Sequence, residues 1–441
     1  MPGTILPVGA LLLGAAILLL GNGLQTILLP VRATLEEFST TSIGLVGAAY
    51  PLGFVVSCYY TPHIVKRVGH IRTFAVLAAI AATTVLLLVL LVHPLAWILI
   101  RTASGFCLAG VFMVIESWLN EAADNRNRGR IFSTYMVINL LAITGGQLML
   151  PLGDPAGHTL FVVAAIAITL GLVPVGLTTS AGPHPIEHVH LRWGRLYRMS
   201  PVGVLGCFFV GLANGAFGSF GAIFATAAGL PIGGVALFMS TALIGGALAQ
   251  IPFGRLSDRI DRRKVMVLAC TLAATFGVVL LLAGEARIDG EPITTLAALP
   301  EVSPALLIGF VLLFGGSVYP LYSLCVAHTN DFVGTEDFVE ASSGLLLTWG
   351  IGATIGPIVA SQVIALVGIA GLFAYTACVH ALFAVFVVYR MTRRAAPRPA
   401  ERESFVGGSF GVDRSTPVGI ALDPRAPELP AAADEDRPAA A

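Results

Sequence analysis

The sequence predicts an all-α membrane protein with twelve transmembrane helices arranged as two pseudo-symmetric six-helix bundles. Twelve apolar stretches of about 20 to 27 residues can each cross a hydrocarbon layer about 30 Å thick, since a helix rises ~1.5 Å per residue. Hydrophobic residues make up 56% of the chain and charged residues 11%, whereas roughly a quarter of a soluble domain is charged. A third observation is that the first half of the chain recurs in the second.

The apolar stretches define the expected helices in order along the chain. No basic residue precedes the first stretch, and it is longer than a signal-peptide core, so we expect a retained helix. All six cysteines fall within the stretches and are expected to be free thiols. The twelve predicted spans are residues 5–31, 42–65, 73–92, 96–121, 131–150, 159–178, 201–227, 233–253, 265–284, 304–328, 339–365 and 369–389.

The internal repeat divides the chain into an N-terminal bundle, residues 1–180, and a C-terminal bundle, residues 201–394, joined by a cytoplasmic loop, 181–200. Residues 395–441 are rich in Pro, Ala and mixed charge, and we expect a disordered cytoplasmic tail that transport does not require. The matched pairs, at shifts of 192 and then 210 residues, are Asn22-Gly23 with Asn214-Gly215, Gly53 with Gly245, Arg67 with Arg259, Gly105 with Gly315, Asn120 with Asn330 and Gly146 with Gly356.

The distribution of Lys and Arg orients the chain in the membrane. Of the 25 basic residues, 22 lie in alternate loops and the tail, two lie in the other loops, and Arg101 lies within a span. Because basic loops stay in the cytoplasm, we expect a multi-pass protein of the bacterial inner membrane, surrounded by lipid, with both termini cytoplasmic. The formal net charge of zero gives no indication of nucleic-acid binding.

Three motifs resemble those of a known family. The run from Gly254 through Asp258 and Arg259 to Arg263 resembles the G-x-L-x-D-R-x-G-R-R cytoplasmic signature of the major facilitator superfamily, and Arg101-Thr-Ala-Ser-Gly105 resembles its R-x-x-x-G pattern. Glu116-Ser117, followed by residues 125–130, is similar to the YcaD-like branch. The resemblance covers roughly residues 5 to 390 and implies the major facilitator fold with alternating access, but it names no substrate.

Charged loop residues suggest a gate on the cytoplasmic side. Lys66 stands where the family usually has an aspartate, and the fifth span lacks the Gly-Pro pair of many proton-drug antiporters. In the resembled fold, Lys66 and Arg67 should approach the acidic loop before the eleventh span. The alternative is that these charges only set topology and remain solvated. In the first expected contact, Lys66 and Arg67 pair with Asp331, Glu336, Asp337 and Glu340. In the second, Asp258 and Asp261, which flank Arg259 in the signature, pair with Arg126, Arg128 and Arg130.

Arg101 and Glu116 are two ionisable residues inside the fourth span. They lie 15 residues apart, about 22 Å along a helix, with ~60° of rotation between them, so they share a side without touching. Glu116 is a candidate proton carrier, or else a helix-end partner of Arg128, Arg130 or Lys66. Arg101 could bind an anionic substrate group or tune proton release, or could have a fixed structural role.

Few other polar residues could line a central cavity. The candidates lie in helices that line the cavity of the resembled fold, and the amides could equally serve helix packing. They are Asn22, Gln25, Asn214, Tyr319 and Tyr322.

The sequence favours a secondary transporter for a small organic solute, coupled to protons and acting as a monomer. It contains no nucleotide-binding loop and no arguable Ser-His-Asp arrangement, and we expect no cofactor. The tract from His184 to His190 is weak support for a metal site, so we expect none. A transporter-like receptor or scaffold, or a lipid-acting membrane enzyme, are the alternatives.

Overall fold

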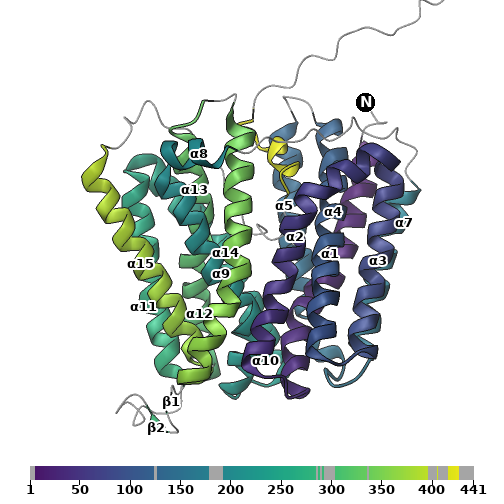
Figure 1. Ribbon diagram of the computed structural model, residues 1–441, viewed down its shortest axis with the longest axis horizontal. Helices are drawn as coiled ribbons and strands as arrows, with labels where there is room; N and C mark the ends of the chain where they lie inside the picture. The colour runs from purple at the N-terminus through teal and green to yellow at the C-terminus, as the bar shows by residue number, and fades with distance from the viewer. Residues whose placement is uncertain are drawn as a thin grey trace, which may run out of the picture.

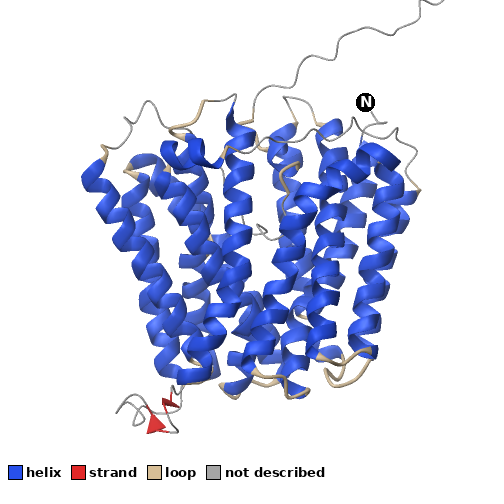
Figure 2. Cartoon of the chain, viewed as in Figure 1, coloured by secondary structure: helices blue, strands red, loops and turns tan. Residues whose placement is uncertain are grey.

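The structure is a computed structural model that describes residues 5–123, 127–177, 192–284, 287–288, 291–292, 303–334, 337–395, 405 and 416–426. Its secondary structure is almost entirely helical, and two very short paired strands lie at one face (Figure 2). Twelve of its helical segments are long and apolar enough to cross a membrane. The prediction of twelve spans is therefore confirmed.

The helices form two bundles side by side (Figure 1). The first bundle consists of α1 Ile5–Leu35, α2 Thr40–Val68, α3 His70–Leu90, α4 Pro94–Ala122, α5 Arg128–Gln147, the 3-10 turn η1 Leu150–Leu152, α6 Thr159–Leu170 and α7 Leu172–Gly176. After the short helix α8 Trp193–Met199, the second bundle consists of α9 Pro201–Ala227, α10 Ile232–Arg259, α11 Arg262–Ala283, strands β1 Arg287–Ile288 and β2 Glu291–Pro292, α12 Pro304–Val318, α13 Pro320–Asn330, α14 Phe338–Val367 and α15 Gly371–Arg393.

Three spans are interrupted, the fifth of them between α5 and η1. The sixth span divides into α6 and α7 at Gly171, and the tenth into α12 and α13 at Tyr319. Pro320 occupies the start of α13, where the missing N–H of proline costs least. By contrast, Pro51 and Pro357 lie inside continuous helices.

Local sequence sets the ends of the helices. The hydroxyl of Ser39 accepts the N–H of Ser42 and so caps α2, and Asp261 accepts the N–H of Arg263 and caps α11. Burial raises the pKa of Asp261, but hydrogen bonds from Arg263 outweigh it and hold that pKa below its usual value. Gly69, with φ of 86°, lets the chain turn directly from α2 into α3.

The two bundles repeat the same helix contacts. A Cβ atom on Gly23 of α1 would collide with the carbonyl oxygen of Ile143 in α5, and one on Gly215 of α9 would collide with that of Ala353 in α14. These positions are equivalent in the two halves, so the predicted duplication holds at the level of individual contacts. Three further pairs of equivalent glycines lie against equivalent main-chain carbonyls. Gly53 lies against Thr102 as Gly245 lies against Leu312, Gly105 against Tyr50 as Gly315 against Ala242, and Gly146 against Leu20 as Gly356 against Leu212.

Helices α1, α2 and α5 of the first bundle contact α9, α14 and α10 of the second. The close contacts between α2 and α14 join the first turns of α2 to the last turns of α14, where Gly44 lies against Pro357 and Ser361. This level is near the face that carries β1 and β2 and is opposite to the face where α1 begins (Figure 1). The bundles therefore touch most closely away from the chain termini.

Part of the tail packs against the bundles. The ring of Phe405 lies against Gly254, and residues 416–426 include a 3-10 turn, η6 Gly419–Leu422, that contacts α4, α5 and α14. The expectation of a disordered tail is therefore wrong for these residues. Composition predicts whether a segment can build its own core, but Leu422 is buried in a core that other helices supply.

Candidate functional site

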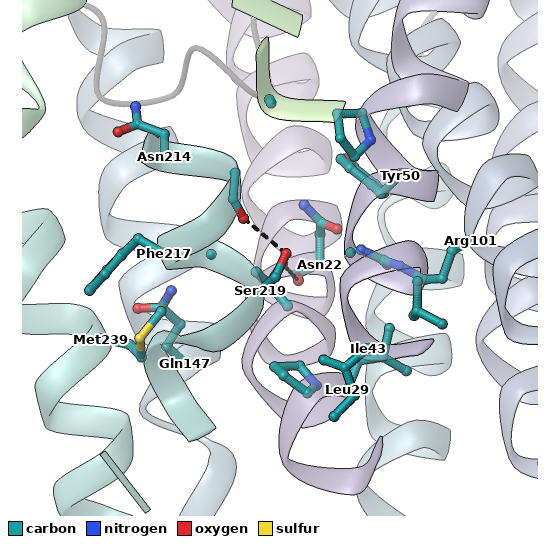
Figure 3. A pocket seen from close by; sticks show the side chains of 18 of the residues that line it. Asn22, Leu29, Ile43, Tyr50, Arg101, Gln147, Asn214, Phe217, Ser219 and Met239 are labelled. Atoms are coloured by element: carbon teal, nitrogen blue, oxygen red, sulfur yellow. Dashed lines mark hydrogen bonds between the residues drawn. The ribbon is translucent and has the colours of Figure 1, made fainter. Parts of the chain in front are cut away.

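A cavity of about 160 Å³ lies between the two bundles (Figure 3). At roughly 15 Å³ for each water on this measure, it has room for about ten waters or a small solute. Residues of α1, α2, α4 and α5 face residues of α9, α10 and α14 across it. The lining consists of Asn22, Thr26, Leu29, Pro30, Ala33, Ile43, Val46, Gly47, Tyr50, Pro51, Arg101, Gln147, Asn214, Gly215, Phe217, Gly218, Ser219, Met239, Leu243, Tyr319, Trp349 and Ala353.

Four of the predicted cavity residues line this cavity. Asn22 of α1 and Asn214 of α9 occupy equivalent places in the two halves, and Tyr319 lies at the break between α12 and α13. The carbonyl oxygen of the Asn214 side chain has no hydrogen-bond partner in the described part of the chain. The pseudo-symmetry therefore brings an amide to the cavity from each half.

Arg101 is the fourth predicted residue, and it is the one charged side chain among the described residues that line the cavity. Its guanidinium carbon lies 4.6 Å from the centre of the Tyr50 ring, a distance suited to a cation–π contact. It is 8% exposed, and its Nε and Nη1 have no hydrogen-bond partner among the described residues. Figure 3 shows the side chain pointing from α4 toward Asn22. The site thus offers unused N–H donors and a positive charge.

Gln25 and Tyr322 are buried but do not line the cavity. Sequence reasoning did not select several residues that do, including Tyr50, Gln147, Ser219 and Trp349. Gln147 was identifiable as an amide within a span. Its Oε1 accepts a hydrogen bond from the hydroxyl of Ser240 in α10 at 3.1 Å, so this bond joins the two bundles.

Glu116 is fully buried in α4, away from the cavity. Its carboxylate accepts the hydroxyl of Tyr135 at 3.4 Å and the N–H of Thr416 at 3.1 Å, and the Thr416 hydroxyl also binds it. Neither of the two arrangements considered from the sequence anticipated a partner in the tail. Of the three cations considered as its partners, Lys66 and Arg130 are exposed, and Arg128 is buried and donates to the carbonyl of Ala426 in the tail.

The acidic residues of the expected gate pair with other arginines in this structure. Arg192, just before α8, binds Glu340 at 2.6 Å, and Arg195 of α8 binds Asp337 at 2.5 Å. Lys66 and Arg67 lie exposed at the end of α2. The pairing of Lys66 with the acidic loop stays a prediction for another conformation.

The acidic residues of the second expected contact, Asp258 and Asp261, also bind arginines of α11 in this structure, and their pairing across the bundles stays a prediction. Arg262 binds Asp331 at 2.8 Å and Asp258 at 3.2 Å, which ties the start of α11 to the ends of α13 and α10. The Arg262 side chain and that of Asp331 are both 1% exposed. Arg259 is exposed, Arg128 is buried beside the tail, and Arg126 and Glu336 fall outside the described residues.

Within the described residues, no group of three or more His, Cys, Asp or Glu side chains is placed to hold a metal ion. The tract from His184 to His190 lies outside the described residues.

A family model and several curated proteins match this chain over most of its length. The model of the Major Facilitator Superfamily matches residues 11–284 and, a second time, residues 203–429. The "Uncharacterized MFS-type transporter YcaD" of Escherichia coli O17:K52:H18 (strain UMN026 / ExPEC) is 25% identical over 353 residues, 80% of this chain and 87% of that protein. The protein of the same name from Salmonella arizonae is 25% identical over 355 residues, with the same coverage of both chains.

Solved structures share the fold. The nucleoside transporter NupG superposes with a TM-score of 0.71 at 14% sequence identity, over 88% of this chain and 100% of its own. A bacterial homologue of the human lysosomal transporter Spinster, in an inward-facing and occupied conformation, gives 0.66 at 14% identity, over 90% and 98%. The twelve spans, the duplicated bundles and these matches lead to one conclusion: the chain belongs to the major facilitator superfamily of transporters and is YcaD-like within it.

Proposed function

We propose that this protein is a secondary active transporter that moves a small organic solute bearing an anionic group across the bacterial inner membrane. Alternating access of the cavity to the two sides and coupling to protons are parts of the proposal. The observation that carries it is the cavity between the bundles, into which Arg101 directs Nε and Nη1, two nitrogens without a hydrogen-bond partner among the described residues.

The electrostatics of Arg101 favour an anionic ligand group. A buried guanidinium loses hydration, and an anion that binds it recovers part of that free energy through charge-assisted hydrogen bonds. The amides of Asn22 and Asn214 can orient the rest of a polar solute, while Phe217 and Trp349 offer apolar surface.

The packing of the bundles supports alternating access. Close contacts such as Gly44 with Pro357 join the bundles at the level near β1 and β2, which is the outer side in the orientation that the basic loops predict. The cavity would then open to the cytoplasm once residues 416–426, which lie between the bundles at that face, have left. Closure of the cytoplasmic side would bring Lys66 toward Glu340, in competition with Arg192.

A ligand screen tests the role of Arg101. Purified protein would be heated with a panel of small carboxylates and phosphate esters, alongside neutral and cationic solutes. We expect stabilisation by anionic compounds, because a ligand that binds only the folded protein raises its melting temperature. Arg101→Gln should weaken binding of the hit about tenfold or more, since a charge-assisted hydrogen bond is worth ~1.5–3 kcal/mol.

Arg72→Gln provides the matched control, because Arg72 is exposed on α3 and remote from the lining. The hit would next be tested for counterflow in proteoliposomes. Binding without counterflow would indicate a receptor or scaffold, and chemical conversion of the hit would indicate an enzyme. If Arg101→Gln and wild-type protein bind the hit with equal affinity, the proposal that Arg101 binds an anionic group of the solute is wrong.

A further inference from the structure

The C-terminal segment 416–426, which we call the clasp, lies between the two bundles at the face where α1 begins (Figure 1). Its turn η6 contacts α4 and α5 of the first bundle and α14 of the second. Leu422 belongs to a buried hydrophobic cluster that includes residues of both bundles, while Ile420 packs against a second cluster formed by the second bundle. The clasp therefore connects two bodies that otherwise meet most closely near the opposite face.

Side chains of α4 and α5 bind the main chain of the clasp at three points. Glu116 accepts the N–H of Thr416 at 3.1 Å, the side-chain amide of Asn120 donates to the carbonyl of Val418 at 2.7 Å, and Arg128 donates to the carbonyl of Ala426 at 3.0 Å. Because these contacts are made to the main chain, they recognise the conformation of the peptide and make few demands on its side chains. They form a binding site spread over two helices.

Two side chains add sequence specificity to the clasp. The Thr416 hydroxyl donates to the buried carboxylate of Glu116. At Gly419, a Cβ atom would collide with the same carboxyl group, so only glycine permits this approach. On the other bundle, the guanidinium of Arg425 lies 5.4 Å from the ring centre of Phe338, at the start of α14.

A second anchor of the tail lies on the signature loop of the second bundle. The N–H of Phe405 donates to Asp258 at 3.0 Å, and its ring fills the space beside Gly254. The tail thus binds Asp258 and Arg128, two residues that the sequence analysis predicts to belong to the cytoplasmic gate. While these residues bind the tail, they are not available to each other across the bundles.

We propose that the cytoplasmic face carries a binding site for this chain's own C-terminal segment, and that the bound clasp is an autoinhibitor that must leave before the bundles can rearrange. Binding to both bundles favours the conformation in which the clasp fits, so conformations that separate α4 and α5 from α14 are reached only after its release. The autoinhibition rests on the proposed transport function, whereas the binding site does not.

Thiol accessibility tests the clasp without any knowledge of the solute. The six native cysteines would be replaced, and a single cysteine would be placed in the cavity at Ser219. A membrane-impermeant maleimide would be applied to the cytoplasmic side in inside-out vesicles. We expect slow labelling of the full chain and about tenfold faster labelling after Thr416→Glu or Gly419→Val, equivalent to ~1.4 kcal/mol. Thr416→Glu places like charges together, and Gly419→Val forces a steric clash with Glu116.

Truncation of the tail and addition of a synthetic peptide form the second part of this test. Removing residues 415–441 should accelerate labelling to the same extent, and a synthetic peptide of residues 414–428 should slow it again. The matched control removes residues 427–441 and keeps the clasp, so its labelling should equal that of the full chain. Equal labelling rates in all variants, or a peptide without effect on the truncated protein, would overturn the proposal.

Transport measurements separate the two proposals. If a solute is found, clasp variants should raise its initial rate of uptake. If the clasp variants change labelling but no transported solute is found, the proposal of a binding site for the clasp stands and the result counts against the proposed transport function. If the protein transports a solute and the clasp variants change neither uptake nor labelling, the autoinhibition proposal is wrong and the transport proposal stands.

Discussion

Arg101 and Glu116 share one helix but have different surroundings. Arg101 faces the cavity and stacks on Tyr50, whereas Glu116 is enclosed by Tyr135 and the clasp. An ionised group held in the membrane costs free energy unless it is paired or solvated, so such residues are retained for a function. The two side chains therefore suit separate tasks, anion binding by the first and proton or tail binding by the second.

Substitution of Glu116 by Gln would separate the two tasks that we propose for it, proton carriage and binding of the tail. The amide keeps an oxygen that can accept the Thr416 N–H, but it cannot carry a proton. We therefore expect Glu116→Gln to retain counterflow at equal pH and to lose uptake driven by an imposed pH gradient. The measurement compares both assays in the same proteoliposomes, with Glu121→Gln, in the last turn of α4, as the control. If the pH dependence of uptake is unchanged, Glu116 is not the carrier.

At the scale of helices, glycine contacts join α1 to α5 and α2 to α4 in the first bundle, and α9 to α14 and α10 to α12 in the second. Where a main-chain carbonyl lies against a glycine, no side chain separates the two helices, and small residues permit such approach in membranes. Each pair of helices is therefore closely packed over several turns. Relative motion is more readily accommodated between the bundles than within these pairs.

The gate between α2 and α14 is testable by charge reversal. Lys66→Glu should slow transport about 1.4- to fivefold, because a solvated ion pair contributes ~0.2–1 kcal/mol. Adding Glu340→Lys to the same molecule should restore the rate if these two residues meet when the cytoplasmic side closes. Because Glu340 binds Arg192 in this structure, Glu340→Lys alone serves as the control for losing that contact. Failure of rescue with both Glu340 and Asp337 would exclude the gate.

For the molecule as a whole, the orientation in the membrane is a proposal that labelling can settle. Arg393→Cys at the end of α15 and a cysteine at the amino terminus should react only with reagent on the cytoplasmic side, and Arg287→Cys in β1 only with reagent outside. The expectation follows from the excess of basic residues in one set of loops. Labelling of the two ends from opposite sides would contradict both the topology and the even number of spans.

The sequence predicted the spans, the duplication and four cavity residues, because each depends on composition or on spacing along one chain. Asn22 and Asn214 were found since an amide within an apolar helix is conspicuous and the repeat relates them. The contact between Glu116 and Thr416 was not predictable in this way, because the two residues are 300 positions apart and the tail has no core of its own. The pairs made by Arg192 and Arg195 depend on which conformation is adopted, and no local pattern encodes that choice.

The hydrogen bond between Gln147 and Ser240 is buried and joins the bundles through α5 and α10. When the bundles part at this point, the bond breaks, and Gln147, which also lines the cavity, needs a water or a solute as its new partner. In a transport cycle that parts the bundles here, the free energy of opening this one amide–hydroxyl contact would depend on what occupies the cavity at that moment.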